Sequence, residues 1–281
     1  MNVQQISIKK FNMKDIQMDS KILLLGRPKS GKSTLISDIL FQHRKFFTAA
    51  LCFSSSEEAN SFYSGMIPDL FIYPSYNIEA VEKLRTRQQK LLRKNGKAHP
   101  ENPAVIVADD CMDKKDWTKS DTTRWLFKNG RHYDIFFLLA SQYAMDIGPE
   151  LRTSVDYVFI MKQTIMKDKR RIYENFAGVF PNLQMFCDVL DNLTEDYHCM
   201  VLNNRATSGK IEDTVFWYKA DLHEKPFRVG TASLWKFHDV YYNDMYEREE
   251  EAEREKQLAK RRYDAGSRRK NAPLFIVNKV S

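Results

Sequence analysis

The sequence is poor in the features that mark exported, membrane-spanning or disulfide-bonded proteins. The apolar run at residues 135–140 is far too short to cross a bilayer, and the first residues carry no charged-then-apolar leader. The four cysteines are widely separated and include no C-x-x-C pair; they are Cys52, Cys111, Cys187 and Cys199. We therefore expect no signal peptide, no transmembrane segment, and reduced, buried thiols in a cytoplasmic protein.

The composition is that of a folded, basic protein. The chain has 281 residues, of which 43% are hydrophobic and 29% are charged, so it can bury one large core with room for appendages. Its formal net charge is +7. That balance favours an anionic partner such as nucleic acid, although it also fits simple solubility.

One run carries the strongest chemical signal, Gly26-Arg27-Pro28-Lys29-Ser30-Gly31-Lys32-Ser33-Thr34. It fits the phosphate-binding pattern G-x-x-x-x-G-K-[ST], and it lies between an apolar run at 22–25 and an amphipathic stretch at 33–46. The two glycines allow successive backbone N–H groups to point at phosphate oxygens, and the following helix adds the positive end of its dipole. We expect Lys32 to reach the β- and γ-phosphates and the Ser33 hydroxyl to hold Mg²⁺. The run predicts a nucleotide-binding loop.

The remaining pattern predicts an α/β fold. Continuous apolar runs at 104–108 and 135–140 are typical of strands buried on both faces of a parallel sheet. Strands that alternate with helices indicate a P-loop NTPase fold with a doubly wound, mostly parallel sheet flanked by helices. We expect the strand at 135–140 to lie beside the strand that precedes the nucleotide-binding loop.

Polar residues follow these two strands directly. Asp109 and Asp110 come after the run at 104–108, and Gln142 follows the run at 135–140. An acid at this position holds the hydrated Mg²⁺ in P-loop NTPases, and a second acid can orient the attacking water. An amide at the end of the neighbouring strand could contact the γ-phosphate or that water, because ligands bind beyond the carboxyl ends of strands. An oligomeric motor would also need an arginine that acts on a neighbour's nucleotide, and the candidates are Arg131 and Arg152.

We divide the chain into an N-terminal arm at 1–20, a P-loop ATPase domain at 21–240, and a charged helix with a basic tail at 241–281. The helix predicted at 77–94 is rich in arginine and lysine, and a solvated surface is the ordinary explanation for such a run. A DNA-contacting role is the alternative. The segment 111–122 is the other place where we expect DNA contacts.

Five segments together resemble the genome-packaging ATPases of nucleocytoplasmic large DNA viruses, which belong to the FtsK–HerA superfamily of ring-forming DNA translocases. They are GRPKSGKS (26–33), VIVADD (105–110), NGRHYDIFFLLASQ (129–142), LRTSVDYVFI (151–160) and RRIYENFAGVFPN (170–182). The resemblance covers about residues 18–205. Its specificity comes from the double acid, the arginine-bearing segment and the strand-terminal glutamine in combination. Many superfamily members have glutamate where this chain has Asp110, which has a shorter reach.

The resemblance implies an ATP-hydrolysing motor that moves double-stranded DNA into a capsid. Lys32 and Ser33 would then be phosphate and Mg²⁺ ligands, with Asp109 as the acid on the metal side. Asp110 would be the hydrolytic acid, Gln142 the sensor, and Arg152 or Arg131 the residue that acts in trans. The implied partners are double-stranded DNA, a ring of five or six copies of the chain, and a capsid or portal component. The implied location is the host cytoplasm, a viral factory or the virion.

Two other classes of protein use the same loop. A nucleotide or small-molecule kinase needs a phosphoryl acceptor site and gains nothing from an acid that activates water, so Asp110 and Gln142 argue against it. A nucleotide-switched, GTPase-like assembly factor would be expected to carry an N-K-x-D element after a strand. The sequence contains no such element.

Overall fold

The computed structural model describes residues 6–111 and 117–270. The chain divides into two compact units, residues 1–235 and residues 236–281. The first unit holds the sheet and most of the helices. The second consists, in its described part, of the continuation of one long helix, α9 (Ala232–Lys270), which begins in the first unit. Within the described residues, no helix combines the length and the apolar character needed to cross a lipid bilayer.

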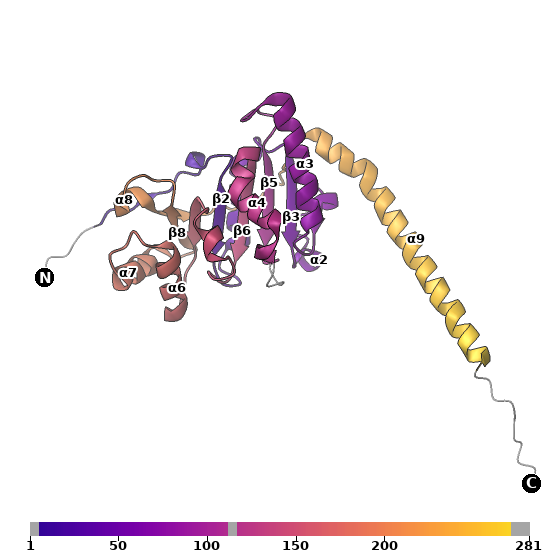
Figure 1. The fold of residues 1–281 in the computed structure, drawn as a ribbon. Helices are drawn as coiled ribbons and strands as arrows, with labels where there is room; N and C mark the ends of the chain where they lie inside the picture. Colours follow the sequence, from indigo (N-terminus) through magenta and orange to yellow (C-terminus); the bar gives the residue numbers. More distant parts are fainter. Residues whose placement is uncertain (1–5, 112–116, 271–281) are drawn as a thin grey trace, which may run out of the picture. The chain divides into compact units, whose positions relative to one another are not determined.

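A single sheet of nine strands, counted over the described residues, forms the centre of the first unit (Figure 1). Its order is β1-β9-β8-β7-β2-β6-β5-β3-β4. The strands are β1 (Lys9–Lys10), β2 (Lys21–Leu25), β3 (Ala49–Ser54), β4 (Ile72–Tyr73), β5 (Ala104–Asp109), β6 (Ile135–Ser141), β7 (Tyr157–Ile160), β8 (His198–Asn203) and β9 (Val215–Lys219). The pairs β7–β8 and β8–β9 are antiparallel, and the other neighbouring pairs are parallel. The mostly parallel α/β sheet predicted from the sequence is confirmed.

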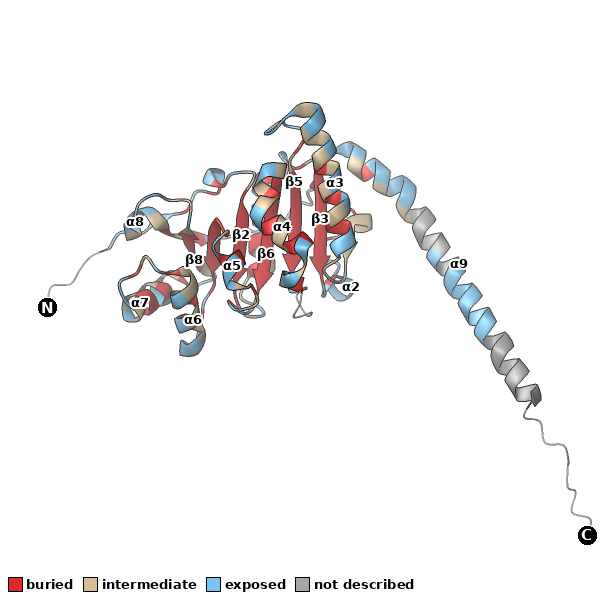
Figure 2. Ribbon diagram, in the orientation of Figure 1, coloured by how far each residue is buried: buried red, intermediate tan, exposed pale blue. Residues whose placement is uncertain are grey.

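Helices connect the parallel strands and cover the two faces of the sheet. The first-unit helices are α1 (Lys32–His43), α2 (Glu57–Asn60), α3 (Ile78–Asn95), α4 (Asp121–Asn129), α5 (Pro149–Arg152), α6 (Met166–Phe176), α7 (Leu183–Leu193) and α8 (Ile211–Thr214). Alternate residues of the central strands enter two separate cores. Leu23 and Ile106 pack with side chains of α3 and α4, whereas Leu24 and Val107 pack with side chains of α1. The central strands are buried throughout (Figure 2), as expected for a sheet covered on both faces.

Some local structure differs from the sequence prediction. In the segment 111–122, the described residues include a short 3-10 turn, Trp117–Lys119, and α4 starts at Asp121. The charged helix expected from residue 241 already begins at Ala232. Its start is set by Thr231, whose hydroxyl accepts a hydrogen bond from the Leu234 N–H at 3.3 Å, an N-terminal cap of the usual kind. In the described part of the N-terminal arm, Lys9 and Lys10 form a short strand that pairs with β9.

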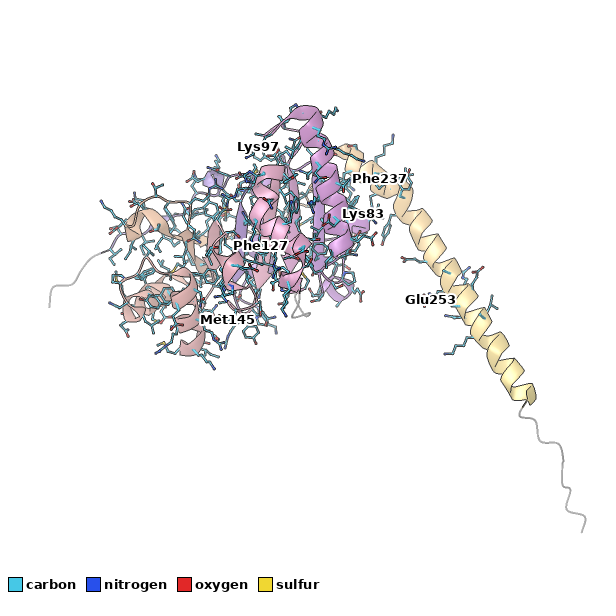
Figure 3. All side chains as sticks on the ribbon, viewed as in Figure 1. Lys83, Lys97, Phe127, Met145, Phe237 and Glu253 are labelled. Atoms are coloured by element: carbon cyan, nitrogen blue, oxygen red, sulfur yellow. The ribbon has the colours of Figure 1, made fainter. Side chains whose placement is uncertain are left out.

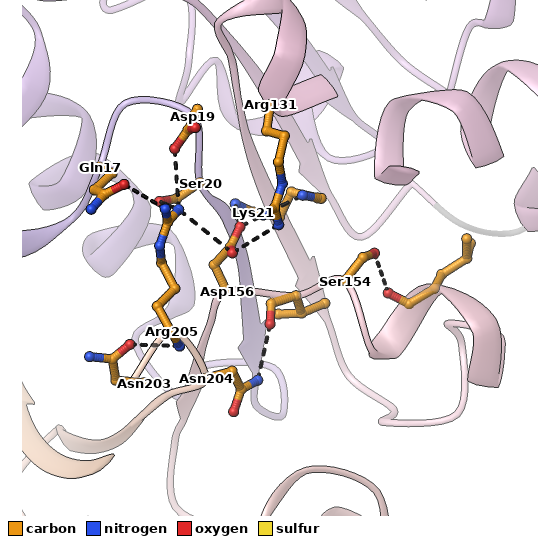
Figure 4. Close-up of polar contacts among 12 residues, drawn as sticks. Gln17, Asp19, Ser20, Lys21, Arg131, Ser154, Asp156, Asn203, Asn204 and Arg205 are labelled. Atoms are coloured by element: carbon orange, nitrogen blue, oxygen red, sulfur yellow. Dashed lines mark hydrogen bonds and ion pairs between the residues drawn. The ribbon is translucent and has the colours of Figure 1, made fainter. Parts of the chain in front are cut away.

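A cluster of buried charges joins the amino ends of the central strands (Figure 4). Asp156 precedes β7 and lies 3.7 Å from the Lys21 ammonium, 3.1 Å from Arg131 and 3.7 Å from Arg205. Its carboxylate also accepts a hydrogen bond from the Lys21 backbone N–H at 2.8 Å. Burial lowers the pKa of Lys21, and Asp156 opposes that shift. One buried carboxylate therefore compensates three cations that come from separate parts of the chain.

We expect Asp156→Asn to destabilise the protein strongly, because the substitution removes the carboxylate that pairs with the buried Lys21 ammonium and leaves only the weaker influence of Asp19. Breaking a buried pair from one side typically costs about 3–5 kcal/mol of unfolding free energy. Urea unfolding at neutral pH measures the change. Glu79→Gln is the matched control, since Glu79 pairs with Lys83 at 2.8 Å on the exposed surface of α3 and its loss should leave the midpoint unchanged. Equal midpoints for the two variants would contradict the role of Asp156.

Candidate nucleotide-binding site

The loop predicted to bind nucleotide lies at the carboxyl end of β2, where two neighbouring strands hold it. The Gly26 N–H donates a hydrogen bond to the Ser141 carbonyl at 3.1 Å, and the Met161 N–H donates one to the Leu25 carbonyl at 2.9 Å. A β-carbon on Gly26 would lie 2.9 Å from the β-carbon of Met161, so only glycine fits here. Gly31 has a φ of +94°, a conformation that glycine adopts without strain, and α1 starts directly after it.

Lys32 folds back over this loop. Its ammonium donates hydrogen bonds to the Gly26 carbonyl at 2.6 Å and to the Arg27 carbonyl at 3.1 Å. Burial lowers the pKa of Lys32, while the charges of Asp110 and Asp109 oppose the shift. The first N–H groups of α1 have no acceptor within the helix. Like a cation, they attract an anion at the helix start. The arrangement is a ready site for phosphate oxygens.

The two predicted acids occupy different environments although they are adjacent. Asp109 is the last residue of β5 and is buried, and its carboxylate accepts a hydrogen bond from the Tyr63 hydroxyl at 2.7 Å. Burial raises the pKa of Asp109, and the Tyr63 hydrogen bond and Lys32 pull it back. Asp110 is exposed and has a φ of +49°, which turns the chain out of the strand. Its carbonyl accepts a hydrogen bond from the Ser55 hydroxyl at 2.9 Å.

Gln142 reaches the second acid, not the first. β6 lies next to β2, as the sequence predicted, and its other neighbour is β5, so Gln142 emerges beside Asp110. The Gln142 side-chain amide donates a short hydrogen bond to the Asp110 carboxylate. The amide therefore fixes the direction in which this exposed carboxylate points.

A cavity of about 660 Å³ brings the loop and the acids together. Its lining comes from the loop, from the acid pair, from the segment after β3 and from the segments that flank β8 and β9. These residues are Arg27, Pro28, Lys29, Gly31, Lys32, Ser33, Thr34, Ser55, Ser56, Asn60, Asp109, Asp110, Tyr197, Lys219, Ala220 and Leu222. Gly26, Ser30 and Gln142 do not line this cavity. The structure thus places Lys32, Ser33, Asp109 and Asp110 around one space.

The residues around this cavity fit a Mg²⁺ ion. Ser33 and Asp109 both line it, and oxygen atoms are the ligands that Mg²⁺ takes, usually alongside water and substrate phosphates. Within the described residues, no group of three or more His, Cys, Asp and Glu forms a metal site by itself. A cation held jointly by Ser33, Asp109 and phosphate oxygens agrees with that finding. It would also offset the burial of the Asp109 charge.

The two candidate arginines lie away from this cavity. Arg131 precedes β6 and pairs with Asp156 at the amino end of β2, about 15 Å from the loop by strand rise. Its side chain is 37% exposed. Arg152 is buried at the end of α5, where it donates to the Ile147 carbonyl at 2.7 Å and to the Asn175 side chain, and burial lowers its pKa. Neither arginine lines the cavity.

Sequence reasoning missed several residues of the site. The serines after β3 follow the same rule that identified the acids, because β3 lies beside β5 and ends at the same edge. Tyr63 gives no comparable signal, since its contact with Asp109 spans 46 positions and follows no motif. The same holds for Tyr197 and Leu222, which come from the far end of the sheet.

The basic helix α3 is partly occupied by internal contacts. Arg85 lies 4.5 Å above the Trp125 ring and pairs with Glu82, and Arg87 donates to the Thr48 hydroxyl at 2.9 Å. Figure 3 shows Lys83 on this helix and Lys97 just after it. The residues of the last two turns that remain exposed are Lys90, Arg93 and Lys94. Of the other predicted DNA-contacting segment, 111–122, residues 112–116 lie outside the described part of the chain.

The strand, loop and helix around Lys32, together with the acid at the end of β5, define a P-loop NTPase fold. Similarity to known proteins then places the chain within a group of viral proteins. It is 35% identical over 248 residues to the uncharacterized protein 015R of frog virus 3, and the matched region covers 84% of this chain and 76% of that protein. It is 31% identical over 255 residues to the uncharacterized protein L437 of Acanthamoeba polyphaga mimivirus, with 89% of each chain covered. The chain belongs to the family that these proteins of large DNA viruses represent.

Solved structures with the same fold include the genome packaging NTPase B204 of Sulfolobus turreted icosahedral virus 2. Its complex with ATP-gammaS has a TM-score of 0.51 at 18% identity and covers 74% of this chain and all of B204. Its complex with sulfate has a TM-score of 0.53 at 16% identity, with the same coverage. No family model matches the chain. The viral relatives and this shared fold confirm the resemblance to viral packaging ATPases seen in the sequence.

The burial of Asp109 predicts a pH-dependent effect on stability. Its pKa is raised above the ordinary value of 3.8, so the folded chain binds this proton more tightly than the unfolded chain. The stabilisation that this proton gives the folded chain is complete when the pH is below the ordinary pKa. It is lost as the pH rises through the raised pKa of the folded chain. At neutral pH the buried carboxylate is therefore unfavourable. Asp109→Asn should raise the melting temperature of the nucleotide-free protein at about pH 7, and the difference should shrink toward about pH 4.

Thermal unfolding followed by circular dichroism across this pH range measures the effect. Asp110→Asn is the matched control, because Asp110 is exposed and its charge does not suffer the same burial. A lower melting temperature for Asp109→Asn at neutral pH would show that its contacts with Tyr63 and Lys32 outweigh burial.

Proposed function

We propose that this chain is an ATP-hydrolysing motor that moves double-stranded DNA into a capsid during genome packaging. One observation carries the hydrolytic part: Lys32 and the pair Asp109–Asp110 line the same cavity, and Gln142 is bonded to Asp110. The viral origin of the relatives supports the packaging role. So does the shared fold with B204, which is itself a genome packaging NTPase.

In the proposed reaction the loop binds the triphosphate through its backbone N–H groups. The Lys32 ammonium leaves the carbonyls of Gly26 and Arg27 and binds the β- and γ-phosphate oxygens. Ser33 and Asp109 would hold Mg²⁺, which neutralises charge on the phosphates when it is bound. The negative charge that develops on the transferred phosphoryl group is thus met by groups already in place.

Asp110 is the residue that we assign to the attacking water. It is exposed to the cavity, and the Gln142 amide holds one carboxylate oxygen so that the other is free to accept a proton or hydrogen bond from water. When the γ-phosphate or the water moves, the hydrogen bond between Asp110 and Gln142 transmits the movement to Gln142. Because Gln142 directly follows β6, a movement caused by hydrolysis can be transmitted to the sheet next to β2.

The motor further needs a ring of subunits, in which one subunit supplies an arginine to the next. Arg131 fits this role better than Arg152, since its side chain is more than one third exposed while Arg152 is committed to buried contacts. Asp156 holds the Arg131 guanidinium in a fixed position at the opposite edge of the sheet from the loop. An arginine at that edge lies too far from the loop to act on the nucleotide of its own subunit, so we assign it to the nucleotide of a neighbour.

Substitutions at the two sides of the cavity should separate hydrolysis from binding. Asp110→Asn keeps the shape of the side chain but removes the base, so we expect kcat for ATP to fall about 100-fold or more with ATP binding retained. Lys32→Ala should lose much of the binding as well. Phosphate release and calorimetric titration with ATP measure the two quantities. Weak ATP binding by Asp110→Asn would mean that Asp110 holds the substrate and does not activate water.

Double-stranded DNA should stimulate ATP turnover at low salt. Contacts with the phosphate backbone release counterions, so the stimulation should decline steeply between about 50 and 200 mM salt. Replacing Lys90, Arg93 and Lys94 together by glutamate should weaken the stimulation if the last turns of α3 contact DNA. Lys83→Glu on the same helix is the control, because Lys83 already pairs with Glu79. An ATPase rate indifferent to DNA at low salt would contradict translocation.

A further inference from the structure

One wall of the nucleotide cavity is apolar and exposed. Tyr197 and Leu222 line it, with 75% and 81% of their surface exposed, and they are the most exposed of the large hydrophobic residues in the described chain. Ala220 also lines the cavity here, and Lys219 is the polar residue at this wall. Exposed apolar groups gathered at a ligand cavity mark a binding surface more often than isolated ones do.

Tyr197 is held in position by an unusual turn. It has a φ of 61°, and the preceding Asp196 has a φ of 49°, so two successive side-chain-bearing residues adopt the left-handed conformation. Such residues persist only where the surroundings enforce them, and they concentrate at functional sites. The turn directs the ring toward the nucleotide-binding loop: a β-carbon on Gly31 would lie 3.6 Å from Cδ1 of Tyr197.

The segment that carries Leu222 is attached to the helix that follows the loop. Asp38, fully buried in α1, accepts a hydrogen bond from the Tyr218 hydroxyl at 2.6 Å and one from the Asp221 N–H at 3.2 Å. The His223 ring lies 2.8 Å from the same carboxylate and stacks on Phe41. These contacts lie on both sides of Leu222. The segment therefore keeps its position relative to Lys32, which belongs to the same helix.

The order of the strands assigns the two walls of the cavity to different parts of a nucleotide. The acids come from β5, and Gln142 follows β6; both strands lie on one side of β2. Tyr197 and Leu222 border β8 and β9, which lie on the other side. Since the terminal phosphates must lie between Lys32 and the acids, the base has to lie toward the opposite wall.

We propose that Tyr197 and Leu222 form the platform on which the purine base of the nucleotide stacks. This proposal rests on the proposed function, because it takes the triphosphate end to lie at Lys32 and the acids. Aromatic rings offer a face to any base, and loss of one stacking partner commonly weakens binding by about tenfold. Leu222 adds apolar contact, and its replacement should have a smaller effect.

The test compares two ligands that share phosphates but not the base. The full chain and its variants are titrated calorimetrically with AMP-PNP, which is not hydrolysed, and with inorganic tripolyphosphate. We expect Tyr197→Ala to weaken AMP-PNP binding about tenfold and Leu222→Ser to weaken it less, with tripolyphosphate affinity unchanged in both. Tyr197→Phe keeps the ring and should bind AMP-PNP like the unaltered chain.

Two results would overturn the platform. One is unchanged AMP-PNP affinity in Tyr197→Ala; the other is an equal loss for both ligands, which would mean that Tyr197 only supports Gly31. An unaltered chain that bound neither ligand would overturn the nucleotide site and the platform together. A chain that bound both ligands as expected but released no phosphate from ATP would overturn the ATPase alone and leave the platform supported.

Discussion

The site depends on the register of three adjacent parallel strands. Leu25 of β2 lies opposite Ser141 of β6, and Ala140 lies opposite Asp109 of β5, so the three strands end at one level. Side chains alternate between the two faces of a strand, and a slip of one residue would turn the Asp109 side chain to the other face. The burial of both faces of these strands prevents such a slip. The hydrophobic core thereby fixes the separation between the Lys32 loop and the acids.

This arrangement places charges where folding alone does not favour them. Lys32 and Asp109 are both buried. Burial lowers the pKa of Lys32 and raises the pKa of Asp109, so in each case it favours the neutral form. Their mutual attraction and the Tyr63 hydroxyl partly compensate. The remaining imbalance suits a site for a highly charged ligand, because phosphates and a divalent cation complete the set of charges. The chain gives up stability at the residues that it uses for chemistry, as functional sites commonly do.

The parts of the site that follow local rules could be predicted from the sequence. The glycines and Lys32 form a continuous motif. The position of the polar residues after β5 and β6 at the site follows from the geometry of parallel sheets. Tyr63, Tyr197 and Asp38 could not be predicted, because their contacts join segments that are far apart in the chain and carry no periodic pattern. Asp38 illustrates the difficulty: in the sequence it is one polar residue on an amphipathic helix, whereas in the structure it is fully buried and joined to residues 180 or more positions away.

The predicted start of α9 was wrong for a different reason. Thr231 is a common capping residue, but the sequence becomes dense in Glu, Arg and Lys only further along, so the predicted boundary at 241 lies beyond the true start.

The antiparallel pair β8–β9 has a consequence for how the molecule can vary. β8 runs against its neighbour β7, so its first residue, His198, lies at the same edge as the end of β9, and the two strands pair there through His198 and Lys219. The connection at 204–214 turns at the distant edge. Insertions after Arg205, whose side chain pairs with Asp156 and Asp19, would leave both ends of the hairpin anchored beside the nucleotide cavity. The far edge can therefore change length while the ligand edge keeps its geometry.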